Sequence, residues 1–152
     1  MTTKQFLPLP YGKDVYSELK GNGCYFVDKT PYLKELIDKD KSNVMLFTRP
    51  RRFGKTLFMS MVEYFLKINS ANPGDTILQQ KLFKDTKILE DREFCAKYMG
   101  QHPVICITLK GVHGVDFEDA YYKLAEVVSA KANEYSFLKD SPSLDEKEKA
   151  KF

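Results

Sequence analysis

Several features that would assign the chain to a special class are scarce or missing. The 152 residues contain only three cysteines, Cys24, Cys95 and Cys106, and no C-x-x-C pair. This set excludes a disulfide scaffold or a cysteine zinc site and favours a reducing compartment. No run approaches the ~20 apolar residues of a membrane-spanning helix, and the N-terminus lacks the layout of a secretory signal. We therefore expect a cytoplasmic protein with no membrane partner.

Charge of either sign is also not in large excess. Lys and Arg total 24 against 21 for Asp and Glu, and a net charge of +3 does not by itself argue for nucleic acid. With 43% hydrophobic residues, the composition is typical of about one globular domain. Arginine is rare, yet Arg49, Arg51 and Arg52 fall within four residues. Because guanidinium groups suit two-point contacts with phosphate or carboxylate, this cluster is a candidate binding segment.

Two continuous apolar runs, 44–47 (VMLF) and 103–109 (PVICITL), predict core strands. Runs without alternation are typical of strands covered on both faces, as in parallel sheets. Apolar periodicity and capping residues predict helices at 14–20, from 31 after Thr30, from 56, within 75–98 and from 117 after Asp116. The predicted fold is α/β, a P-loop NTPase-type parallel sheet flanked by helices. Two strands make this sheet incomplete in the chain.

The same patterns predict three regions: an N-terminal region 1–43, a partial P-loop core 44–140, and the start of a further helix at 141–152. Ser143–Glu146 matches a capping box, which predicts that a helix begins there. A helix this short needs a partner to pack on. We therefore expect the chain to be the front part of a longer protein.

The segment Thr48–Thr56 (TRPRRFGKT) carries the clearest chemistry, because it follows an apolar run and opens a helix. The first turn of a helix leaves N–H groups unpaired, which makes an anion site. Gly54 lets the backbone approach phosphate oxygens. Lys55 is expected over the β- and γ-phosphates of a bound nucleotide, and the Thr56 hydroxyl is expected to ligate Mg²⁺.

The expected phosphate donors are the backbone N–H groups of Arg52, Phe53, Gly54, Lys55 and Thr56. The full pattern is G-x-x-x-x-G-K-[ST], and Arg49 replaces its first glycine. Alternatively, G-K-T is a helix start with a chance lysine, and the arginines pair with surface acids.

The segments LPYGKDVYSELKGNGCYFVDKT, YLKELID and LFTRPRRFGKTLFMSMVEYFLK resemble the AAA-ATPase-like family of bacterial proteins. The resemblance covers about residues 6 to 128, including HPVICITLKGV, which resembles the next core strand of that family. It implies a P-loop with Gly54, Lys55 and Thr56 as its binding residues and Arg51 and Arg52 as matching arginines. Replacement of the first glycine is usual in this family, and a PD-(D/E)XK nuclease domain commonly follows.

The acidic Walker B strand of the family, of the type L-I-D-E-Y-D, does not occur in this sequence; PVICITL runs into Lys110. Hydrolysis would require the Asp and Glu of that strand. The primary hypothesis is thus the N-terminal portion of an ATPase that binds Mg·ATP. In the complete protein, Lys55, Arg51 and Arg52 would stabilise the transferred phosphoryl group, the arginines in the same or a neighbouring subunit.

Other interpretations remain open. The arginine cluster also fits a nucleic-acid or protein binding module with a degenerate anion site that serves an attached nuclease. The third interpretation is a fragment without activity of its own, which associates through sheet edges into a homo-oligomer. Asp28 and Lys29, within the resemblance, are either a helix-start acid and a solvated lysine or residues for adenine contact or domain packing. His102 and His113 are expected on the surface.

Overall fold

The computed structural model describes residues 7–37, 44–141, 144–145 and 147. The chain divides into two compact units. The first comprises residues up to 102 except 70–72, and the second comprises 70–72 and everything from 103 onward. The capping box predicted at Ser143–Glu146 lies partly outside the described residues.

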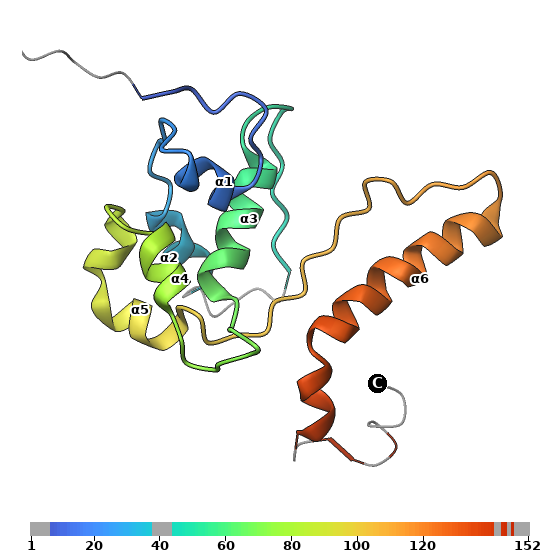
Figure 1. Ribbon diagram of the computed structural model, residues 1–152. Helices are drawn as coiled ribbons and strands as arrows, with labels where there is room; N and C mark the ends of the chain where they lie inside the picture. The colour runs from blue at the N-terminus through green and yellow to red at the C-terminus, as the bar shows by residue number, and fades with distance from the viewer. Residues whose placement is uncertain (1–6, 38–43, 142–143, 146, 148–152) are drawn as a thin grey trace, which may run out of the picture. The chain divides into compact units, whose positions relative to one another are not determined.

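The first unit is built from short helices joined by loops (Figure 1). Its α-helices are α1 (Tyr16–Gly21), α2 (Pro31–Ile37), α3 (Lys55–Leu66), α4 (Ile77–Leu82) and α5 (Arg92–Tyr98), with a 3₁₀ turn η1 (Lys87–Glu90) between the last two. The helices predicted from apolar periodicity are thereby confirmed in this unit. None of the described helices combines the length and apolar character that crossing a bilayer requires.

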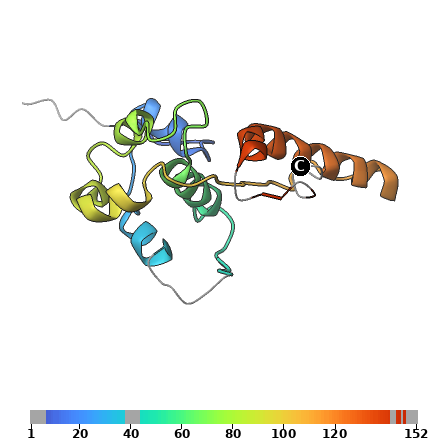
Figure 2. The same cartoon turned by 90° about the horizontal axis from the view of Figure 1, so that it is seen from below.

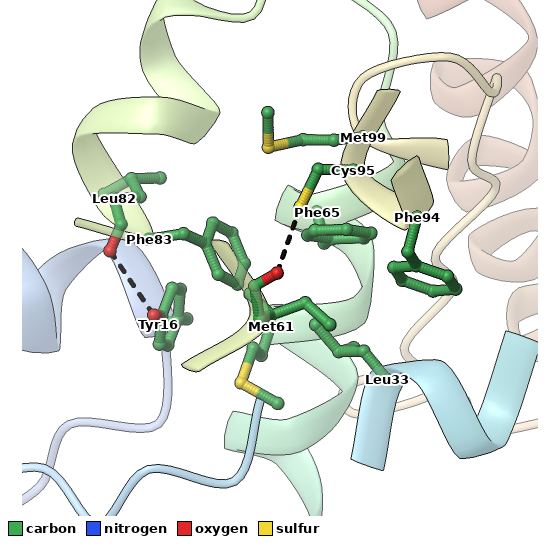
Figure 3. Close-up of a cluster of buried hydrophobic side chains, with 10 residues drawn as sticks. Tyr16, Leu33, Met61, Phe65, Leu82, Phe83, Phe94, Cys95 and Met99 are labelled. Carbon is green, nitrogen blue, oxygen red and sulfur yellow. Dashed lines mark hydrogen bonds between the residues drawn. The ribbon is translucent and has the colours of Figure 1, made fainter. Parts of the chain in front are cut away.

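Phe65 of α3 lies at the centre of the hydrophobic core (Figure 3). The centre of its ring lies 5.3 Å from the centre of the Phe83 ring, in an edge-on contact, and 5.7 Å from the centre of the Phe94 ring, in a stacked contact. Tyr16 of α1 and Leu33 of α2 are fully buried in the same cluster. Helix α3 therefore packs its C-terminal half into the core, which fixes the helix whose N-terminus begins at Lys55.

Polar contacts tie α1 to α3 and α4. The Tyr16 hydroxyl donates to the carbonyl oxygen of Leu82 (3.3 Å), and the Tyr16 N–H donates to Ser60 Oγ (3.0 Å). Burial, with a smaller contribution from the charge of Asp28, raises the pKa of the Tyr16 hydroxyl. This hydroxyl thus stays protonated and remains a hydrogen-bond donor inside the core.

The predicted parallel sheet is wrong for the described residues, in which the structure contains helices and no strands (Figures 1 and 2). The apolar runs 44–47 and 103–109 lie in irregular segments, and Leu46 is 85% exposed. Among described residues, the only recorded bridge is a parallel one between Lys67 and His102, outside both runs. Strand propensity needs a neighbouring ladder to become a strand, and neither run has one.

The second unit contains α6 (Phe117–Glu134), one continuous helix (Figure 2), and the 3₁₀ turn η2 (Ser136–Asp140). The predicted cap is confirmed, because the Asp119 N–H donates to the Asp116 carboxylate at 2.8 Å. Tyr135 is buried, and its hydroxyl both donates to the Val104 carbonyl and accepts from the Val104 N–H. No residue of α6 is buried.

Candidate functional site

The loop before α3 contains two residues with left-handed backbone conformation. Arg52 and Gly54 have positive φ angles of 66° and 75°, on either side of Phe53. Alternation of left- and right-handed residues turns successive N–H groups toward one side. Gly54 adopts this conformation at little cost, whereas Arg52 is strained in it. The Phe58 N–H donates to the Gly54 carbonyl (2.9 Å), which closes the first turn of α3.

The Lys55 side chain folds back over the loop. Its ammonium donates to the carbonyl oxygens of Arg49 (2.6 Å) and Pro50 (2.9 Å). An ammonium has three N–H donors, so these two bonds leave one donor for an anion. These two bonds hold the backbone at residues 49 and 50 close to the Lys55 ammonium, at the start of α3.

The arginine cluster extends from this loop. Arg49, Arg51 and Arg52 are all exposed. Within the described part of the chain, none of the three guanidinium groups forms an ion pair or a hydrogen bond. The alternative in which they pair with surface acids therefore finds no support among these residues.

A pocket of about 640 Å³ adjoins the loop. Its described lining includes the basic residues Arg49, Lys55 and, from the segment before α2, Lys29. The aromatic and aliphatic lining residues are Tyr32, Leu36, Met45, Phe47, Phe53, Phe58 and Met59. Glu35 is the one acidic residue among the described lining residues. The pocket therefore offers positive charge for an anion and aromatic and aliphatic surface for a flat apolar group.

The structure separates the predicted site residues into two groups. Phe53, Gly54 and Lys55 line the pocket, whereas Arg51, Arg52 and Thr56 are not among its lining residues. Thr56 is exposed at the start of α3, and its role as the Mg²⁺ ligand stays a prediction. Sequence analysis considered Lys29 only as a solvated lysine or for adenine contact or domain packing, and it did not place Lys29 beside the phosphate loop, because that proximity depends on the fold.

Asp28, the residue before Lys29, joins two distant segments. Its carboxylate accepts from the N–H groups of Thr30 and Lys87, each at 2.9 Å. The Thr30 hydroxyl, which was predicted to cap α2, instead accepts from the Ile88 N–H (3.2 Å), and Thr30 is fully buried. Of the alternatives for Asp28, the structure thus favours domain packing. We call Asp28, Thr30, Lys87 and Ile88 the clasp.

Asp28→Asn is expected to destabilise the first unit by about 1 to 2 kcal/mol, because the amide retains one acceptor and turns an N–H group toward the second donor. Burial tends to raise the pKa of Asp28, but hydrogen bonds from Lys87 and Thr30 outweigh it and lower the pKa. The stabilisation of the folded unit by the ionised Asp28 carboxylate is therefore complete above the ordinary carboxyl pKa of about 3.9. It is lost as the pH falls through the lowered pKa of Asp28 in the folded chain.

Urea unfolding of the wild-type chain and of Asp28→Asn between about pH 3 and pH 7 tests this prediction. We expect the two unfolding free energies to begin to converge as the pH falls below about 3.9. Asp85→Asn is the matched control, since it removes the same charge from an exposed side chain next to the clasp. Equal unfolding free energies for Asp28→Asn and Asp85→Asn at neutral pH would contradict the clasp.

Comparison with known proteins shows the family of the chain. Residues 10–152 match the model of the AAA-ATPase-like family, described as "Predicted AAA-ATPase". The chain belongs to this family, which confirms that part of the resemblance seen in its sequence.

A curated relative is described as "Uncharacterized protein in vnfD 5'region" of Azotobacter chroococcum mcd 1. It is 27% identical over 122 residues, an alignment that covers 80% of this chain. The aligned part is 20% of the relative, so the chain spans about a fifth of its length. No solved structure matches the chain.

Proposed function

We propose that the chain binds Mg·ATP through the loop Arg49–Thr56, as the nucleotide-binding part of an AAA-like ATPase. The observation that carries the proposal is the Lys55 ammonium, which draws the carbonyls of Arg49 and Pro50 around itself beside the pocket. Such a loop presents N–H groups, a lysine and the positive end of a helix dipole to phosphate oxygens.

The pocket fits the rest of a nucleotide. Phe47 and Phe58, whose rings lie 5.5 Å apart, form part of its apolar wall. A purine is flat and largely apolar, so aromatic and aliphatic side chains are suitable neighbours for it. Thr56 would contribute one oxygen to Mg²⁺, whose other ligands would be phosphate oxygens and water.

Hydrolysis of ATP is not proposed for the loop alone. It needs a carboxylate that orients or activates the attacking water, and the loop itself contains no Asp or Glu. In the complete ATPase, Arg51 and Arg52 would add positive charge to the transferred phosphoryl group. We propose nucleotide binding, rather than turnover, for the 152 residues.

Calorimetric titration of the 152-residue chain with ATP in the presence of Mg²⁺ tests the proposed function. We expect saturable binding to one site, competition by inorganic tripolyphosphate, and little competition by adenosine, because the phosphate contacts dominate. Absence of binding by both ATP and tripolyphosphate would refute the proposal.

Nucleic-acid binding for an attached nuclease is the second candidate, favoured by the exposed guanidinium groups of Arg51 and Arg52 outside the pocket. Duplex DNA that binds with a steep salt dependence, because phosphate contacts release counterions, and that ATP does not displace would favour this function. Displacement of the DNA by ATP would place both ligands on the same loop.

A further inference from the structure

We propose that Lys29 is a second phosphate-binding lysine, which contacts the phosphate chain of the nucleotide together with Lys55. This inference rests on the proposed function, because it assigns a residue to the same anion site. Lys29 comes from the segment before α2 and is 26 positions from Lys55 in the sequence.

The Lys29 ammonium lies over the glycine of the loop. A Cβ atom built on Gly54 would be 3.9 Å from Lys29 Nζ. Both residues also line the 640 Å³ pocket beside Arg49 and Lys55. Phosphate oxygens that approach the Gly54 backbone would therefore meet this ammonium at the same time.

The backbone on both sides of Lys29 is held in place by the clasp. Asp28 accepts from the N–H groups of Thr30 and Lys87, and buried Thr30 accepts from Ile88. The Lys29 carbonyl accepts from the Tyr32 N–H at 3.2 Å. These contacts fix where the Lys29 side chain starts, which reduces the conformational freedom that a bound anion must restrict.

The charges around the pocket also favour an anionic ligand. Among the lining residues that the structure describes, three are basic and one is acidic. The described residues provide no ion pair to Lys29. Like charges gathered at a pocket repel one another, and an anion bound between them relieves that repulsion. A polyphosphate is long enough to meet cations from two segments.

The test compares Lys29→Gln with Lys29→Arg and with Lys81→Gln, a matched control on α4 that removes the same charge away from the pocket. Binding of ATP and of inorganic tripolyphosphate to the 152-residue chain is measured by calorimetry. We expect Lys29→Gln to weaken both ligands about tenfold, as for loss of a charged hydrogen bond. Lys29→Arg should restore most of the affinity, and Lys81→Gln should leave it unchanged.

The outcomes separate this inference from the proposed function. If the wild-type chain binds ATP and Lys55→Ala loses it, but Lys29→Gln binds normally, the assignment of Lys29 is wrong and the nucleotide site stands. A lowered thermal midpoint in Lys29→Gln, absent in Lys81→Gln, would show a structural role and also overturn the assignment. Failure of the wild-type chain to bind either ligand refutes both proposals.

Discussion

Lys55→Ala is expected to weaken ATP binding about a hundredfold, the largest effect of any single change at the loop. A factor of this size corresponds to about 3 kcal/mol, the upper range for a hydrogen bond to a charged group. The substitution removes the ammonium that we propose contacts the phosphates, and it removes both bonds to the carbonyls of Arg49 and Pro50. Calorimetry with Mg·ATP measures the loss.

Lys81→Ala is the matched control, because it makes the same substitution on α4, outside the pocket. Far-UV circular dichroism should show the same helix content in both variants, since the two hydrogen bonds that Lys55→Ala removes go to carbonyls of the loop before α3. Unchanged ATP affinity in Lys55→Ala would remove this residue from the proposed site, even if the wild-type chain binds nucleotide.

The sequence was sufficient to predict the loop and the helix that follows it. Gly54, Lys55 and Thr56 mark the loop through local chemistry, and the apolar stripe that includes Met61 and Phe65 marks the buried face of α3. Both features depend on residues a few positions apart, so neighbouring side chains determine them. The cap at Asp116 was predicted for the same reason.

The absence of strands from the described residues was not predictable in the same way. An apolar run such as 103–109 reports a strand tendency, but a strand also requires a neighbouring backbone to pair with. In the described residues the run lies in an irregular segment, and Ile105 is 68% exposed. The same limit applies to Lys29 and the clasp. Asp28 reaches the Lys87 N–H across 59 positions, a contact that no local pattern encodes.

Phe65→Ala is expected to destabilise the first unit by about 3 to 5 kcal/mol, the range for removing a large buried aromatic side chain. Phe65 is fully buried, and its ring packs against both Phe83 and Phe94 (Figure 3). Because single domains are stable by only about 5 to 15 kcal/mol, much of the unit's stability would be lost. Urea unfolding followed by circular dichroism measures the change.

Phe117→Ala is the control for this prediction, since it deletes an identical side chain that is 76% exposed on α6. It should leave the unfolding free energy within about 0.5 kcal/mol of the wild-type value. Phe65→Leu should recover part of the loss, because a smaller cavity remains. Similar unfolding curves for Phe65→Ala and Phe117→Ala would contradict a core centred on α3. Such a result would also contradict the inference that the packing of Phe65 fixes α3, the helix that begins at Lys55.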